Sequence, residues 1–275
     1  MSPDLARKYE TLKSLIASYG RVAVAFSGGV DSSLLSAVAH DVLGADALAI
    51  TAVAPLVPAR ELADAQSFCA ARGIRHELIH PDPLAVEGVR TNAPDRCYVC
   101  KKAIFTQIFA CAHEQGIDIV ADGSNLDDLG DYRPGLAALE EMQVASPLRE
   151  ANMTKQDIRD LSQELGLPTW SKQSSACLAT RYPYGEELTE EKLARADAAE
   201  DVLLSRGFTQ VRVRVHGDVA RIELPPARFA DLLEDQQRLD VTRALQALGF
   251  DYVTLDLLGY RTGSMNETLN GKDGQ

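Results

Sequence analysis

The sequence predicts an α/β fold, with a doubly wound parallel sheet in residues 1–187 and a small α+β domain in residues 188–275. In the first part, short apolar runs alternate with helical patterns, which favours parallel strands covered by helices on both faces. One of these runs, 22–26, leads directly into a glycine-paired turn and a helix. From about residue 188 a charged helix precedes two alternating strands that meet at Gly217 and Asp218, which is typical of a hairpin.

The expected elements of the first domain follow from apolar spacing and from residues that end helices. Gly73 and Gly116 stop two helices, and Thr154 with Asp157 begins a third that Gly166 ends. The stretch from 81 to 96 shows no regular pattern. The elements are helix 5–17, strand 21–26, helix 32–43, strand 47–53, helix 58–72, strand 76–80, helix 98–115, strand 118–121 and helix 154–165.

The second domain is expected to have the order αββαβ and an antiparallel sheet. Its elements are helix 189–206, strand 210–216, strand 219–224, helices across 226–247 and strand 252–257.

Composition restricts the classes of function. The net charge is −12, which disfavours a nucleic-acid partner and favours a small-molecule substrate, although a local basic patch stays open. No apolar stretch approaches 18 residues and the first residues do not form a signal peptide, so we expect no membrane span and a cytoplasmic location.

The turn after the first strand is a candidate phosphate-binding site. Gly28 and Gly29 allow backbone N–H groups to converge on an anion, and the following helix adds its positive end. The pattern differs from the common P-loop and dinucleotide motifs. The alternative is a turn that binds nothing. The candidate phosphate-binding residues are Ser27, Gly28, Gly29, Val30, Asp31, Ser32 and Ser33.

An acidic tip at 122–128 follows strand 118–121 at the same predicted edge of the sheet. Asp128 and Asp31 offer hard oxygen ligands, so we predict Mg²⁺ there; a solvated loop is the alternative. The tip resembles the segment of the ATP pyrophosphatases that lies around the nucleotide and its metal, and this resemblance implies Gly123 and Val53 as further nucleotide contacts. Arg133 could meet a phosphate or lie at the surface.

The five cysteines fall into two groups. Cys69 and Cys111 lie in apolar helical surroundings and are expected in the core. Cys97, Cys100 and Cys177 lie in polar segments. A C-x-x-C pair suits a redox pair, half of a zinc site or part of an iron–sulfur ligand set. Three thiolates could hold three irons of a four-iron cluster, and a purely structural role is the alternative.

The segment around Cys177 is rich in groups that bind anions. A thiolate beside Lys172 and Arg181 would have a lowered pKa.

Three arginines, Arg212, Arg214 and Arg221, alternate along the predicted hairpin. They form a basic face for an anionic substrate or a neighbouring subunit, or a solvated one. The weaker candidates for a metal site are Glu200, Glu223 and Asp231.

The phosphate turn resembles the loop of the PP-loop ATP pyrophosphatases, the fold of GMP synthetase, NAD synthetase and the tRNA thiolases. Five segments together resemble the LarE family of sulfur transferases across essentially the whole chain. They are SGGVDS (27–32), RCYVCKK (96–102), DGSNLDD (122–128), CLATRYPYGE (177–186) and GYRTGSMNE (259–267).

The resemblance implies ATP-dependent thiolation of pyridinium-3,5-biscarboxylic acid mononucleotide for the nickel-pincer nucleotide of lactate racemase. ATP adenylates a carboxylate, pyrophosphate leaves, and sulfur displaces AMP. Cys177 is the implied sulfur site, with Arg181 orienting the substrate. Arg212 and Arg214 are implied at the substrate phosphate, and Lys101 is a further substrate contact.

The family has two sources of sulfur. Some members sacrifice the downstream cysteine, whereas those with the C-x-x-C pair hold a 4Fe-4S cluster, which Cys97, Cys100 and Cys177 favour here. A sulfide or sulfur-donor protein would replenish it, and trimers or hexamers are implied. The rival interpretations are a tRNA thiolation enzyme, an amidotransferase-type or NAD-synthetase-like ligase, and a nucleotide-binding redox sensor without turnover.

Overall fold

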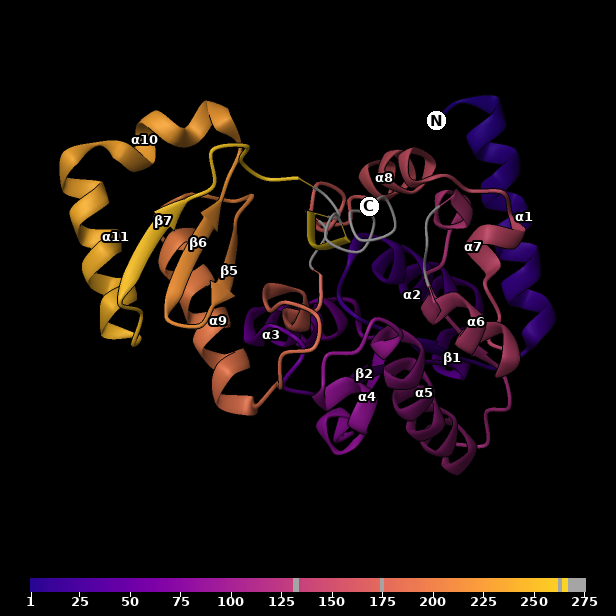
Figure 1. Ribbon diagram of the computed structural model, residues 1–275. Coiled ribbons are helices and arrows are strands. Elements are labelled where there is room, and N and C mark those ends of the chain that lie inside the picture. The colour runs from indigo at the N-terminus through magenta and orange to yellow at the C-terminus, as the bar shows by residue number, and fades with distance from the viewer. Residues whose placement is uncertain (131–133, 174–175, 262–263, 267–275) are drawn as a thin grey trace. The chain divides into compact units, whose positions relative to one another are not determined.

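The computed structural model describes residues 1–130, 134–173, 176–261 and 264–266 (Figure 1). The chain divides into two compact units. Unit 1 comprises Met1–Val89 and Asp95–Ser175, and unit 2 comprises Arg90–Pro94 and Ala176–Gln275. Within the described residues, no helix is both long and apolar enough to cross a membrane.

Unit 1 is built on a four-stranded sheet in the order β3-β2-β1-β4, and every pairing is parallel. The strands are β1 (Val22–Ala25), β2 (Ala47–Ala52), β3 (Arg75–Ile79) and β4 (Val120–Ala121). The chain builds β1, β2 and β3 outward in one direction and then returns to add β4 on the other side of β1. This confirms the predicted parallel α/β fold and puts the reversal of strand order, where such sheets bind ligands, between β1 and β4.

The helices of unit 1 begin and end close to the predicted positions. Thr154 caps α8, and Asp157 completes a capping box with it, as expected. Gly73 ends α3 in the left-handed conformation, with φ +66°. The helices are α1 (Pro3–Tyr19), α2 (Val30–Leu43), α3 (Ala59–Arg72), α4 (Glu87–Arg90), α5 (Arg96–Glu114), α6 (Pro134–Glu141), α7 (Pro147–Glu150) and α8 (Lys155–Glu164), with 3₁₀ turns η1 (Gly44–Asp46), η2 (Pro83–Ala85) and η3 (Leu126–Gly130).

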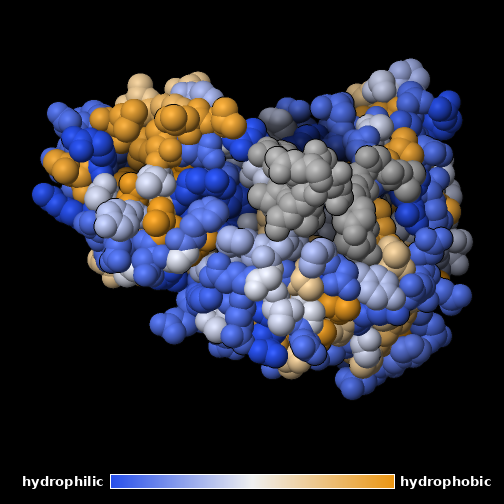
Figure 2. All heavy atoms as spheres, in the orientation of Figure 1, coloured by the Kyte–Doolittle hydropathy of each residue, from blue (hydrophilic) through white to orange (hydrophobic). Residues whose placement is uncertain are grey.

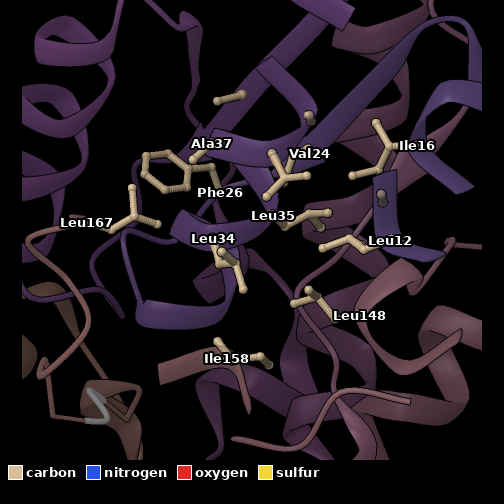
Figure 3. Packing of buried hydrophobic residues seen from close by; sticks show 14 of the residues in the cluster. Leu12, Ile16, Val24, Phe26, Leu34, Leu35, Ala37, Leu148, Ile158 and Leu167 are labelled. Atoms are coloured by element: carbon tan, nitrogen blue, oxygen red, sulfur yellow. The ribbon is translucent and has the colours of Figure 1, made fainter. Parts of the chain in front are cut away.

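Alternation along β1 divides the core of unit 1 between the two faces of the sheet. Val22 and Val24 pack with residues of α1, α2 and α8, whereas Ala23 packs with residues of α5 and α6. Figure 3 shows the first cluster, in which Leu34 and Leu35 of α2 lie among side chains from β1, α1 and α8. Helix α2 is therefore held rigidly directly behind the turn that precedes it.

Unit 2 contains a mixed three-stranded sheet in the order β5-β6-β7. Strands β5 (Arg212–His216) and β6 (Val219–Glu223) are antiparallel, but β7 (Tyr252–Leu255) runs parallel to β6. The expectation of a wholly antiparallel sheet was therefore wrong, because α10 and α11 return the chain to the starting end of β6 before β7 begins. The helices are α9 (Glu190–Leu204), α10 (Phe229–Leu233) and α11 (Asp235–Ala247), with η4 (Leu178–Arg181), η5 (Pro226–Arg228) and η6 (Ser264–Asn266).

Five residues from the middle of the chain belong to unit 2. Among them Asn92 is fully buried with φ +50°, and its side-chain amide donates to the carbonyls of Tyr182 (3.1 Å) and Pro183 (2.8 Å). The backbone carbonyl of Asn92 accepts from the N–H of Gly185 at 3.1 Å. Residues 81–96, which were expected to be irregular, thus contain the 3₁₀ turn η2, the short helix α4 and the hydrogen bonds of Asn92.

Candidate active site

The candidate phosphate turn lies between β1 and α2. Gly28 has φ +71°, and a Cβ there would lie 3.2 Å from the Cβ of Ala65 and 3.3 Å from the carbonyl of Glu61, both on α3. Gly29 is the N-cap of α2, and no side chain of the described residues caps this end. The first N–H groups of a 14-residue helix are therefore directed at the turn without a capping group, which suits an anion.

Serine hydroxyls organise the same turn. Ser32 Oγ lies 3.1 Å from Ser27 Oγ, donates to the Gly29 carbonyl at 3.2 Å and accepts from the Ser27 N–H at 3.3 Å. Ser33 Oγ is fully buried and has no hydrogen-bond partner within the described part of the chain. The turn is therefore preformed by its own side chains.

The acidic tip after β4 meets the first turn of α2. A Cβ on Gly123 would lie 3.0 Å from the Ser32 nitrogen, so glycine allows the close approach of the two segments. Asn125 donates from its side chain to Asp31 Oδ1 at 3.4 Å, and its backbone N–H donates to Asp128 Oδ2 at 2.9 Å. The structure thus brings Asp31 and Asp128 to the two sides of one asparagine, at the strand reversal.

A lysine that the sequence analysis missed completes this site. Lys155, the first residue of α8, places Nζ 2.5 Å from Asp31 Oδ2, and its backbone N–H donates to Asp127 Oδ2 at 2.8 Å. The side chains of Lys155 and Asp31 are 34% and 24% exposed. The available signal was its position immediately after the Thr154 cap, which fixes where the side chain emerges but not what it meets.

The other predicted contacts in unit 1 have clear positions. Val53 directly follows β2, is half-buried, and donates its N–H to the Ile79 carbonyl at 2.8 Å. Lys172 pairs with Glu61 (2.9 Å) and Asp64 (2.8 Å) of α3, and these carboxylates hold its pKa above the usual value despite burial. Arg133, a possible phosphate ligand, lies outside the described residues.

The C-x-x-C pair occupies the first turn of α5. Cys97 is exposed and Cys100 is half-buried; their spacing of three residues puts both on one side of the helix. Cys69 is 1% exposed, which confirms it as a core residue, whereas Cys111 is half-buried and packs against the core. Burial raises the pKa of Cys69 to about 12 and also raises that of Cys111. A Cβ on Gly135 of α6 would lie 2.9 Å from Cδ of Lys101, so α6 packs closely on this turn.

In unit 2, Cys177 lies at the start of the 3₁₀ turn η4. It is exposed, and its backbone carbonyl accepts from the N–H (3.0 Å) and the hydroxyl (2.8 Å) of Thr180. Nη1 of Arg181 donates to the carbonyls of Ala176 (2.9 Å) and Cys177 (3.2 Å). We call residues 176–181 the cysteine turn.

Arg181 is anchored by a buried carboxylate. Its Nε and Nη2 donate to the two oxygens of Glu200, each at 2.8 Å, and both side chains are fully buried. Burial alone would raise the pKa of Glu200, but the Arg181 charge holds that pKa below its usual value. Glu200 also accepts from the Val213 N–H at 3.1 Å. The Arg181 guanidinium therefore supports the backbone of the cysteine turn. The sequence analysis predicted a contact with substrate for this residue.

Arg214 also supports the cysteine turn. It donates to Glu223 (3.1 Å), to the Thr180 carbonyl (2.5 Å) and to Ser264 Oγ (2.9 Å). Glu223 is fully buried and also accepts from Arg221 at 3.1 Å. Sequence reasoning missed Ser264 because a serine 50 residues from Arg214 gives no local signal.

The three weaker metal candidates do not meet as a cluster. Glu200 and Glu223 are paired with arginines, and Asp231 on α10 accepts from Arg228 at 2.5 Å at the surface. Within the described ranges, no three histidine, cysteine, aspartate or glutamate side chains form a group able to hold a metal ion.

Arg212, the other predicted phosphate ligand, is half-buried on β5. Its guanidinium carbon lies 5.4 Å from the centre of the Tyr260 ring. Burial, together with the positive charge of Arg181, lowers the pKa of Arg212. An arginine that is costly to keep charged gains from a bound anion.

The parallel sheet, the phosphate turn at its strand reversal and the acidic tip define a PP-loop ATP pyrophosphatase. No family model matches the chain. It is 44% identical over 265 residues to an uncharacterised protein of Synechocystis sp., covering 96% of this chain and 99% of that protein. It is also 44% identical over 266 residues, 96% of both chains, to the pyridinium-3,5-bisthiocarboxylic acid mononucleotide synthase of Lactiplantibacillus plantarum. A more distant relative, the tRNA-specific 2-thiouridylase of Rhizobium leguminosarum, is 28% identical over 67% of this chain and 57% of its own.

The chain belongs to the LarE family, that of the pyridinium-3,5-bisthiocarboxylic acid mononucleotide synthases.

Proposed function

We propose that the protein is an ATP-dependent sulfur transferase that converts a carboxylate of pyridinium-3,5-biscarboxylic acid mononucleotide into a thiocarboxylate, in nickel-pincer nucleotide biosynthesis. The observation that carries the proposal is the 44% identity to a synthase along 96% of both chains. The phosphate turn of unit 1 and the cysteine turn of unit 2 supply the two kinds of chemistry that this reaction needs.

The first step forms an acyl-adenylate. A substrate carboxylate oxygen attacks the α-phosphorus of ATP, and the bond to the bridging oxygen breaks to release pyrophosphate. The uncapped N–H groups of α2 and the hydroxyls of Ser27 and Ser33 would bind the phosphate charge. Lys155 adds a positive charge beside Asp31 at the same edge. No acid–base pair is required, because the attacking carboxylate is already ionised and pyrophosphate is a good leaving group.

Mg²⁺ fits the oxygen ligands at this edge. Asp31 and Asp128 present carboxylates on the two sides of Asn125. When bound, the ion would neutralise phosphate charge during pyrophosphate release. Asp31 would exchange its ion pair with Lys155 for the metal, which would free the ammonium for a phosphate oxygen.

The second step replaces AMP by sulfur at the activated carbonyl carbon. Cys177 is proposed as the sulfur-site residue, since the exposed thiol stands on a turn whose carbonyls are fixed by buried guanidinium groups. Arg212 is proposed for the substrate phosphate and Lys101 as a further substrate contact, whereas Arg214, predicted for the same phosphate, has its guanidinium bonded to Glu223, Thr180 and Ser264. Arg181, predicted to orient the substrate, is proposed instead to support the backbone of the turn that carries the thiol.

A 4Fe-4S cluster is the proposed sulfur source, because three cysteine thiolates are the kind of ligand that such a cluster takes. Cys97, Cys100 and Cys177 are free of disulfides and outside the core, unlike buried Cys69. The three thiolates would hold the cluster, which would supply sulfide sulfur to the activated carboxylate and be reloaded by sulfide or a donor protein. The alternative route transfers the Cys177 sulfur itself, by thioester formation followed by elimination that leaves dehydroalanine.

The proposal includes a homo-oligomer and a cytoplasmic location. Five cysteines, none of them in a disulfide, suit a reducing compartment. On unit 2, hydrophobic side chains gather over α10 and the end of β7 (Figure 2). The exposed hydrophobic side chains of unit 2 include Leu257 (85% exposed) and Leu258 (70%), which follow β7, and Leu233 (51%), which ends α10. Such a patch favours a protein neighbour, and a trimer or hexamer of this chain is the proposed one.

The test uses anaerobically purified protein, MgATP and the pyridinium biscarboxylate mononucleotide, without RNA. We expect AMP, pyrophosphate and, by mass spectrometry, a thiocarboxylate 16 mass units heavier for each oxygen replaced by sulfur, which is roughly the difference between the two atoms. In Cys177→Ala, pyrophosphate release should persist while thiocarboxylate is lost. Absence of pyrophosphate with this substrate from wild-type protein would reject the proposal.

Iron and acid-labile sulfide counts then separate the two sulfur routes. About four irons per chain that disappear in Cys97→Ala, but persist in Cys111→Ala on the same helix, would support the cluster. Without iron after anaerobic reconstitution, loss of H₂S from Cys177 after turnover would support the sacrificial route.

A further inference from the structure

The described residues of the closing segment, 259–261 and 264–266, include Ser264, which contacts the buried pair of Arg214 and Glu223. The Tyr260 N–H donates to the Leu224 carbonyl at 3.0 Å, which fixes the segment beyond β6. Ser264 is 6% exposed; its hydroxyl accepts from Arg214 Nη2 at 2.9 Å and lies 3.3 and 3.4 Å from the two oxygens of Glu223. The hydroxyl therefore accepts from the cation and donates to the anion, which links the two charged groups of one buried pair.

Arg214 transmits this constraint to the cysteine turn. Its Nη1 donates to the Thr180 carbonyl at 2.5 Å while Nε donates to Glu223 at 3.1 Å. A guanidinium is planar, so the three acceptors fix its rotation together. Nη2 also lies 3.1 Å from Glu223 Oε2. Without the Ser264 hydroxyl, Nη2 would keep Glu223 as its acceptor, so the guanidinium would turn toward Glu223 at the expense of the Thr180 carbonyl.

A displaced Thr180 would displace Cys177. The Thr180 N–H and hydroxyl both donate to the Cys177 carbonyl, at 3.0 and 2.8 Å. Arg181 holds the other side of the same turn through Ala176 and Cys177. Two arginines thus support one four-residue 3₁₀ turn, and Arg214 bonds to Ser264 of the closing segment.

We infer that Ser264 is a positioning residue for Cys177, acting through Arg214 and the Thr180 carbonyl. The inference rests on the proposed role of Cys177 in sulfur transfer. It assigns to the closing segment the task of fixing where the sulfur-site thiol stands relative to its own unit.

The experiment measures thiocarboxylate formed per AMP formed in anaerobically purified, iron-loaded protein. We expect Ser264→Ala to lower this ratio by about threefold to tenfold, the range of one hydrogen bond between buried groups, because acyl-adenylate would be lost to water. AMP formation should change by less than about twofold. Ser264→Thr, which keeps the hydroxyl, should restore the ratio.

Ser205→Ala is the matched control. Its hydroxyl is exposed at the end of α9 and donates to the Val202 carbonyl at 3.1 Å, away from the cysteine turn. This variant should keep the wild-type ratio. A hydroxyl that only stabilised the fold would lower AMP and thiocarboxylate together, so an unchanged ratio in Ser264→Ala overturns the inference.

A second readout needs no turnover. In the Cys97→Ala/Cys100→Ala background, the alkylation rate of Cys177 and its dependence on pH are followed by peptide mass. We expect Ser264→Ala to change that rate by at least about threefold, and identical profiles would overturn the inference. If wild-type protein forms no AMP, the proposed function fails while alkylation still tests the position of the thiol.

Discussion

Removal of the Lys155 ammonium should slow the release of pyrophosphate but change the free energy of unfolding only slightly. The pair with Asp31 is 2.5 Å long, but its side chains are 34% and 24% exposed, so Lys155→Ala should lower the free energy of unfolding by only about 1 kcal/mol or less. A lost charged hydrogen bond to departing pyrophosphate is worth roughly 1.5–3 kcal/mol. We therefore expect pyrophosphate release to slow by about 10- to 150-fold.

The same helix offers a matched control. Lys8 pairs with Asp157 of α8 at 2.7 Å, with side chains 18% and 20% exposed. Lys8→Ala should cost similar stability, measured by denaturant unfolding, and leave the rate of pyrophosphate release unchanged. The reasoning is refuted if Lys155→Ala stays within about twofold of wild type, or if Lys8→Ala slows release equally.

Four further outcomes are expected. Gly28→Ala should lower ATP affinity and cost about 1–2 kcal/mol, because it forces a side chain to φ +71° against α3; Gly20→Ala, at φ +68° in open space, should leave ATP affinity intact, and equal ATP titrations would contradict this. Glu200→Gln should cost about 3–5 kcal/mol in denaturant unfolding, since it leaves the buried Arg181 charge uncompensated, and a wild-type unfolding curve would disprove that. Cys69, with its pKa raised to about 12 by burial, should resist alkylation at pH 8 in intact-mass assays; its contribution to stability should fall only as pH rises from about 8.5 toward 12, because the unfolded thiol ionises first. Leu257→Asp should reduce the oligomer to smaller species in light scattering at unchanged melting temperature; a wild-type mass would exclude this patch from the interface.

Elements with strong local signals could be predicted from the sequence. The Thr154 cap with Asp157, and the glycine that ends α3, set their helices by contacts within a few residues. Alternating strands and helices sufficed for the parallel sheet and for placing the phosphate turn at its edge. The direction of β7 was missed because it depends on the path of two helices rather than on any residue in the strand.

The candidate site likewise contains residues whose role follows from the local sequence and residues whose contacts depend on the fold. The backbone of the phosphate turn follows from two glycines in sequence, whereas Lys155 reaches Asp31 across 124 residues. Arginines on an alternating strand suggested an anion site, yet Arg214 is bonded to Glu223, Thr180 and Ser264. The charge pattern of a sequence shows that a positively charged side chain is present, but the fold decides which oxygen atom it contacts.

Residues Arg90–Pro94 belong to unit 2 although they lie within the sequence of unit 1. One cleavage of the chain therefore cannot separate the two units. A fragment that begins at residue 176 would lack Asn92, whose amide serves the Tyr182 and Pro183 carbonyls just beyond the cysteine turn. Those carbonyls would be left without their donor, at a cost of order 1–3 kcal/mol for each one that stays buried. The two units therefore cannot be exchanged between proteins as two continuous fragments, because the stretch that follows Cys177 is hydrogen-bonded to Asn92, which lies between the two sequence segments of unit 1.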